Sequence, residues 1–193
     1  ALAFIGDTLS SKGDKLAEVF IVDLPEKMQD YAQAGEWPLE GSETRLPAPP
    51  RGVQQRRLTF SAERRYPGLV SQPRHWLRAS PDGSAIAFLM KDDHGVVQLW
   101  SISPNGGTPQ QITRSASDIQ SAFSWHPQQH SLAFICDNSV MLCEAGSGKM
   151  RRLTARSDRA PSGDAVVISP DGQQVAYMRD IDGYRQIFTA AIG

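Results

Sequence analysis

Charged residues and histidines able to hold an ionic ligand recur in short segments of this chain. Lys91–His94 and Arg179–Tyr184 are rich in aspartate, while Arg74-His75 and Arg156–Arg159 combine arginine with histidine or aspartate. Arginine binds carboxylates and phosphates through charge-assisted hydrogen bonds, and histidine and aspartate also ligate divalent metals. The same composition suits plain hairpin loops that face water. The candidate ligand-binding residues are His75, Arg74, Asp92, Asp93, His94, Arg159, Asp180, Asp182 and Tyr184.

A repeated phrase predicts how these segments are positioned. Ser80–Gly83, with the sequence Ser-Pro-Asp-Gly, leads into the apolar run Ala85–Phe88. The same order returns in Ser169–Tyr177, and a degenerate copy runs from His126 to Phe134. A phrase that recurs at intervals of about 45 residues is typical of repeat architectures.

The phrase itself has the chemistry of a tight turn. Proline presets φ at the first central position, aspartate bonds to the local backbone, and glycine adopts the positive φ that ends the turn. We therefore expect Asp82 and Asp171 to be structural rather than catalytic. The middle copy has His126-Pro127-Gln128-Gln129 in this place, so we expect its turn to be looser.

Apolar runs around each phrase predict four short strands per unit, A to D. In the second unit these are His75–Ala79, Ala85–Met90, Val96–Ile102 and Gln111–Thr113. The four units of one all-β domain are 1–60, 74–113, 120–154 and 164–193. The first lacks strand A and the last lacks strand D, which gives fourteen strands.

Four-stranded antiparallel units at this spacing predict a partial β-propeller of about three and a half blades. An unclosed array exposes apolar faces at both ends. We therefore expect this chain to be the C-terminal part of a larger propeller of six to eight blades, whose remainder is a partner of the residues seen here.

One insertion, residues 25–52, interrupts the first unit. Pro25–Gly35 has proline in its first turn and glycine after its end, a pattern that predicts a short helix. Leu46–Pro50 is rich in proline and predicts an extended tether. The insertion is either a partner-binding element or a decoration that covers a blade edge.

The Ser-Pro-Asp-Gly phrase resembles the PD40 repeat, which is WD40-like and belongs to the TolB-like propellers. Related repeats occur in prolyl-oligopeptidase, tricorn and oligogalacturonate-lyase propellers. The resemblance covers Ala1 to about Ala191, apart from the insertion. It implies a non-catalytic platform that binds a protein or polymeric ligand through its loops, in the periplasm by family analogy or otherwise in the cytoplasm. The alternative is an enzyme related to oligogalacturonate lyases, with a divalent metal in the channel and His75 as a candidate ligand.

Blade topology sorts the loops between two rims. The B–C and D–A connections lie on one rim, here called the front rim, where propeller ligands usually approach the channel. The candidate residues named above belong to this rim. His126 and His130 belong to the opposite rim, and we expect them to be single surface histidines.

Composition and missing motifs exclude several functions. With 20 basic and 21 acidic residues the net charge is −1, which gives no general attraction to nucleic acid. The longest apolar run, Ala85–Met90, is too short to insert across a membrane. Neither a GxSxG nucleophile elbow nor a phosphate-binding glycine loop occurs, and no cofactor is expected. Cys136 and Cys143 fall on neighbouring predicted strands, either as buried free thiols or as a short cross-strand disulfide.

Overall fold

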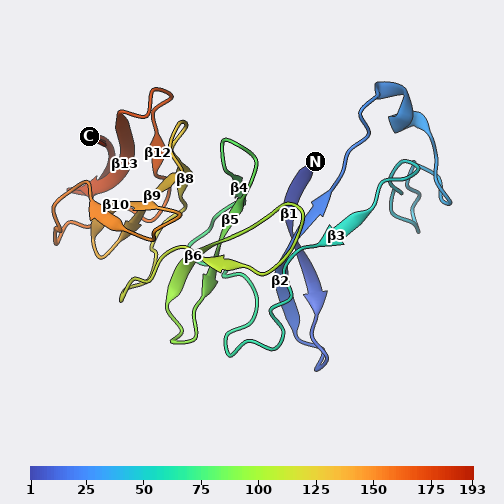
Figure 1. Ribbon diagram of the computed structural model, residues 1–193, viewed down its shortest axis with the longest axis horizontal. Helices are drawn as coiled ribbons and strands as arrows, with labels where there is room; N and C mark the ends of the chain where they lie inside the picture. The colour runs from blue at the N-terminus through green and yellow to red at the C-terminus, as the bar shows by residue number, and fades with distance from the viewer.

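The computed structural model describes all 193 residues as four antiparallel sheets and one short 3-10 helix. The sheets follow one another side by side from the N-terminus to the C-terminus (Figure 1). The fold is therefore an all-β partial propeller, and the prediction of fourteen strands is confirmed. Blade 1 contains β1 (Leu2–Leu9), β2 (Lys15–Val22) and β3 (Gln55–Arg57); blade 2 contains β4 (Arg78–Ala79), β5 (Ile86–Lys91), β6 (Val97–Ile102) and β7 (Gln110–Gln111); blade 3 contains β8 (Ser124–Trp125), β9 (Ser131–Cys136), β10 (Ser139–Glu144) and β11 (Met150–Arg152); and blade 4 contains β12 (Val167–Ile168), β13 (Gln174–Ile181) and β14 (Tyr184–Ala191).

Three apolar clusters fill the spaces between successive blades. Because neighbouring strand residues point to opposite faces, Phe88 of β5 packs toward Val19 of blade 1, whereas Leu89 packs toward Phe134 of blade 3. The third cluster joins blades 3 and 4 and includes Ile135 and Tyr177. The inner blades are thus buried on both faces, which explains why their central strands carry apolar residues on both faces rather than alternating.

The Ser-Pro-Asp-Gly phrases form the turns between the first two strands of blades 2 and 4. Asp82 Oδ1 accepts hydrogen bonds from Ser80 Oγ at 2.6 Å and from the Ser84 amide at 3.1 Å. The hydroxyl of Ser80, together with the amide and hydroxyl of Ser84, holds the pKa of Asp82 at about 2. Asp171 repeats this pattern with Ser169. The predicted structural role of both aspartates is confirmed.

The degenerate turn in blade 3 is not loose, and His126 is not a surface residue, so both expectations were wrong. His126 is buried, and its Nδ1 accepts the amides of Gln128 and Gln129 at 3.1 and 3.0 Å. The imidazole, which stands where the other turns have Ser80 and Ser169, therefore supplies the side-chain acceptor of this turn. His130, which is exposed, stacks on Trp125 with ring centroids 4.9 Å apart.

A threonine after the last strand of blades 1, 2 and 3 closes each sheet. Val19 donates its amide to Thr59 Oγ1 at 2.8 Å, and equivalent bonds join Leu99 to Thr113 and Val140 to Thr154. The hydroxyl satisfies a strand amide beyond the point where backbone pairing ends. The pairs Leu58-Thr59, Ile112-Thr113 and Leu153-Thr154 occupy this place in the three blades.

A buried polar side chain lies beside this threonine in blades 1 and 2. Glu18 is fully buried, receives the Ser61 amide at 2.8 Å and forms an ion pair with Arg57 at 2.9 Å. In blade 2 the equivalent residue is Gln98, which receives the Ser115 amide at 3.1 Å. The two blades thus meet the same hydrogen-bonding requirement once with a carboxylate and once with a neutral amide.

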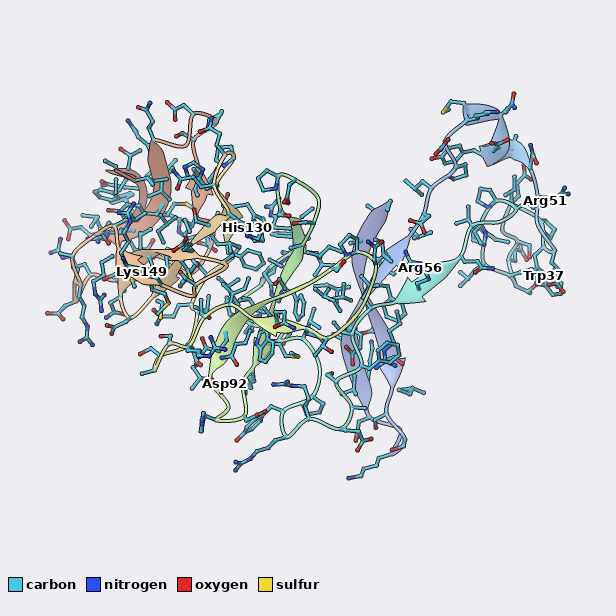
Figure 2. All side chains as sticks on the ribbon, in the orientation of Figure 1. Trp37, Arg51, Arg56, Asp92, His130 and Lys149 are labelled. Carbon is cyan, nitrogen blue, oxygen red and sulfur yellow. The ribbon has the colours of Figure 1, made fainter.

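Residues 25–52, here called the arm, leave blade 1 between β2 and β3 and extend away from the sheets (Figure 1). The predicted helix is reduced to one 3-10 turn, η1 (Met28–Ala32), none of whose residues is buried. Without a surface to pack against, so short a segment gains too little to form a longer α-helix. Trp37 lies in the arm (Figure 2), with the Arg45 guanidinium 4.5 Å from its ring. The arm covers no blade edge among these residues.

The helices of the structure were also compared with the requirements for crossing a membrane. The 3-10 turn is the single helix of the structure, and no helix has the length and apolar character needed to cross a bilayer.

Candidate ligand-binding groove on the front rim

The connection between blades 1 and 2, residues 58–77, runs along the front rim between two sheets. Leu69 donates its amide to the carbonyl of Ala17 in blade 1 at 2.9 Å. The next residue, Val70, donates to the carbonyl of Leu89 in blade 2 at 3.1 Å. Backbone bonds to both sheets thus hold the segment in place, so the side chains that it carries are displayed from a fixed support.

Two hollows adjoin along this connection. The outer one, of about 410 Å³, includes Tyr66 and Lys91 in its lining. The inner one, of about 560 Å³, includes Trp76. Gln72 lines both hollows. We call the two hollows together the rim groove; it leads from the front rim toward the first strands of blades 2, 3 and 4.

The inner hollow has an apolar floor and a cationic wall. Phe123 and Val166 are buried in the floor, while Val167, on the first strand of blade 4, is 55% exposed. Arg74 lies over the Trp76 ring, with its guanidinium carbon 4.9 Å from the centroid. This cation–π contact fixes the direction of both side chains before any ligand arrives.

On the far wall of the inner hollow, the positive charge of Arg185 is balanced by carboxylates of the same chain. Arg185 of β14 forms ion pairs with Asp164 at 2.6 Å and with Asp180 at 3.4 Å. The predicted site residue Asp180 therefore lies beside the groove and serves to position Arg185. Arg74 and Arg78, on the near wall, pair with no carboxylate.

Asp92, a predicted site residue, is used by the β5–β6 turn. Its Oδ1 accepts the amides of His94 at 2.9 Å and Val96 at 3.0 Å, and its Oδ2 accepts the Gln98 amide nitrogen at 3.2 Å. Burial alone would raise the pKa of Asp92, but these three donors outweigh it and hold the pKa below its usual value. Figure 2 shows Asp92 at the hairpin. The residue shapes the turn and is not free to take a ligand.

His75 is likewise committed to the backbone. Its Nδ1 lies 3.1 Å from the carbonyl oxygen of Pro73, and its Nε2 lies 3.3 Å from the amide nitrogen of Leu89. Nδ1 must then carry the proton and Nε2 must accept, so the ring is neutral. Burial lowers the pKa of His75, outweighing the bond to Pro73. The candidate metal ligand is therefore a structural histidine.

The remaining predicted site residues are not brought together. Asp93 is exposed and lies 3.4 Å from Arg64, and His94 is exposed at the same hairpin. Asp182 adopts a φ of 51° in the β13–β14 turn, next to Tyr184, which is 74% exposed. Arg159 is exposed on the connection between blades 3 and 4. Of the nine candidates, Arg74 lines the groove and Asp180 supports its wall.

The residues that complete the groove were missed by the sequence analysis. Arg78 and Val167 belong to the first strands of their blades, β4 and β12. Arg185 lies at the start of β14, and its partner Asp164 lies in the connection before β12. No local pattern marks this pairing, because it joins two segments that meet in the folded blade.

A divalent metal does not fit these residues. No group of three or more histidine, cysteine, aspartate or glutamate side chains is placed to hold an ion. Both ring nitrogens of His75 and both carboxylate oxygens of Asp92 already have partners. We therefore derive no metal-assisted step.

The two cysteines are free and buried. In the register of β9 and β10, Cys136 lies opposite Ser139 and Cys143 opposite Leu132, so they occupy opposite ends of the hairpin. Burial raises the pKa of both thiols, that of Cys143 to about 12. The alternative of a cross-strand disulfide is excluded in this fold, and neither thiol is an activated nucleophile.

Sequence comparison finds a relative that is much longer than this chain. No protein-family model matches the chain. A curated relative, the uncharacterized protein YidR of Escherichia coli strain K12, is 58% identical over 178 residues, which are 92% of this chain and 43% of YidR. The chain thus spans less than half the length of that relative.

Solved propellers share the fold at low identity. TolB from Acinetobacter baumannii superposes with a TM-score of 0.59 at 16% identity, over 99% of this chain and 39% of TolB. A chain of a nidogen/laminin complex gives 0.56 at 8% identity, over 97% of this chain and 57% of that one. An oligogalacturonate lyase in complex with manganese gives 0.50 at 17% identity, over 72% of this chain and 39% of the lyase. These likenesses establish a TolB-like propeller fold.

Proposed function

We propose that this chain is part of a non-catalytic propeller that binds a protein partner along the rim groove. The observation that carries the proposal is a set of cation–aromatic contacts to two rings, Tyr66 and Trp76, on the connection between blades 1 and 2. Arg65 and Lys91 lie 5.5 and 5.6 Å from the centroid of the Tyr66 ring, and Arg74 lies 4.9 Å from that of Trp76. Tyrosine, tryptophan and arginine are the residues that contribute most to binding at protein interfaces.

The support beneath these side chains favours binding. Trp76 is 56% exposed, yet Arg74 holds its ring and the connection is bonded to two blades. Because this side chain is already held in place, covering it with a partner costs little conformational entropy. One chain of similar fold was solved in a nidogen/laminin complex, which shows that this fold occurs in a protein–protein assembly.

A photo-crosslinking experiment tests the proposal. A photoreactive amino acid is placed at Trp76 or Tyr66 of the full-length protein, with His130 on the opposite rim as the matched control. We expect discrete crosslinked partners from positions 66 and 76 and none from position 130. Equal crosslinking from all three positions, or none from the front rim, would contradict a binding function for the groove.

We also propose that further blades of the same polypeptide cover the outer faces of blades 1 and 4. Ile187 is 75% exposed on blade 4, on the face opposite Tyr177 and Phe188, and Leu2 is 54% exposed on blade 1. Soluble proteins rarely leave such sheet faces open. The length of YidR, of which this chain spans 43%, leaves room for additional blades.

A further inference from the structure

We propose that the rim groove selects an extended acidic peptide segment that carries an apolar side chain. This inference rests on the proposed binding function and specifies the chemistry of the partner. It comes from three features of the groove: its unpaired cations, its apolar floor and the carboxamide of Gln72.

The first feature is a local excess of positive charge. Four cations line or border the groove without forming an ion pair; they are Arg65, Arg74, Arg78 and Lys91. The chain as a whole has a net charge of −1, so this is a regional property. Unpaired cations beside a groove attract and orient carboxylates.

The nearby carboxylates do not cancel this field. Asp93 is paired with Arg64, and Asp164 is paired with Arg185. Glu63 is exposed and unpaired at the outer end of the same connection. Because three of the four free cations stand over aromatic rings, their positions are set by contacts within the protein. A ligand carboxylate therefore meets donors that are already arranged.

The second feature is the floor of the inner hollow. Phe123 and Val166 form its buried base, and Val167 is 55% exposed. Burying an aliphatic or aromatic side chain against them is favourable by about 25 cal/mol for each Å² of apolar surface removed from water. A free phosphate or a uniformly polar polymer has no group to place there, whereas a peptide supplies apolar and acidic side chains in alternation.

The third feature concerns the peptide backbone of the ligand. Gln72 lines both hollows; Gln120 lines the inner one, but its Oε1 already accepts the Asn138 amide at 3.4 Å. A carboxamide offers both a donor and an acceptor, the two functions that an extended backbone requires. Gln72 therefore lies where a peptide passing from Tyr66 to Trp76 exposes its amide groups.

A peptide-display experiment with the full-length protein tests this inference. A random twelve-residue library is selected on the wild-type protein, and the affinity of one enriched peptide is then measured by fluorescence anisotropy. We expect enriched sequences in which aspartate or glutamate flanks an aliphatic or aromatic residue. Arg74→Glu should weaken binding of that peptide at least about tenfold, and Val167→Asp should weaken it as well. Arg159→Glu, which makes the same charge change elsewhere on the rim, should leave the affinity within about twofold.

The outcomes separate this inference from the proposed function. If neutral or basic peptides are enriched, or if Arg74→Glu and Arg159→Glu act equally, acidic selection is wrong, while crosslinks at positions 66 and 76 would still support rim binding. If the crosslinks are absent as well, the binding function itself fails. Proper folding of each variant is checked by its thermal midpoint, so that loss of binding is not a loss of structure.

Discussion

The imidazole of His126 in blade 3 is hydrogen-bonded to the carbonyl oxygen of Gly172 in blade 4, with Nε2 and the oxygen 3.1 Å apart. Nδ1 accepts two amides, so Nε2 carries the proton and donates it. A degenerate turn in one blade is thereby fixed to the regular turn of the next. The residue that departs from the Ser-Pro-Asp-Gly phrase in blade 3 thus forms a contact between blades.

Gly172→Ala should destabilise the protein more than Gly83→Ala. Both glycines have positive φ, 74° and 70°, so both variants incur the backbone cost of about 1–2 kcal/mol. A Cβ at position 172 would also lie 2.5 Å from Nε2 of His126, whereas one at position 83 has no neighbour within 4 Å. We expect an extra loss of about 1–3 kcal/mol in the free energy of unfolding, measured by denaturant titration. Equal losses would show that His126 moves aside freely.

Gln98→Glu should destabilise blade 2, and Gln111→Arg should restore part of the loss. The substitution places a carboxylate next to Asp92 without the arginine that Glu18 has in Arg57. Gln111 occupies the place of Arg57, since its side-chain nitrogen donates to the Thr113 carbonyl as that of Arg57 does to Thr59.

The Gln98→Glu variant should lose about 3–5 kcal/mol, the cost of leaving a buried charge unpaired. Denaturation of the single and double variants gives the coupling energy between the two positions. A double variant no more stable than Gln98→Glu would refute the equivalence of the two blades.

The stability of the protein should fall as the pH is lowered below about 6.5, and His75 should account for part of this loss. Burial holds the pKa of His75 below the ordinary histidine value of 6.5, so the unfolded chain takes up the proton first. The stabilising contribution is complete above pH 6.5 and is lost as the pH falls toward the folded-state pKa. His75→Gln should flatten this dependence in urea unfolding between pH 5 and pH 8, while His94→Gln, at an exposed site, should not.

The 193-residue chain on its own should self-associate, whereas the full-length protein should remain monodisperse. The outer faces of blades 1 and 4 expose apolar side chains that neighbouring blades would cover. Light scattering coupled to size-exclusion chromatography measures this directly. A monomeric, cooperatively folding 193-residue chain would mean that these faces need no cover.

The strand pattern was predictable from the sequence because it depends on local information. Proline, aspartate and glycine specify the turns at Ser80–Gly83 and Ser169–Gly172, and the apolar runs between them have no alternative to burial. The role of His126 was not predictable, because the amides that donate to its Nδ1 are local but the carbonyl that accepts from its Nε2 is 46 residues away. The same holds for the groove, since Arg74, Phe123 and Val166 come from three connections that meet in the fold.

Polar residues were the main source of error in the predicted site. Asp92 and His75 have the composition of a ligand site, yet their hydrogen bonds end on backbone amides and carbonyls of their own blade. Charge and residue type do not distinguish a carboxylate that binds a ligand from one that satisfies a turn. That distinction depends on donors which become adjacent once the hairpin has formed.

The amides of Leu69 and Val70 constrain how far blade 2 is rotated relative to blade 1. Because they are consecutive and bond to different sheets, a single peptide unit links blade 1 to blade 2 at this point. Ile119 and Gln120 repeat the arrangement between blades 2 and 3, bonding to Val97 and Ile135. Substitutions on the blade faces can change the packing there, but an insertion between either pair of amides would change the rotation from one blade to the next and hence the curvature of the whole propeller.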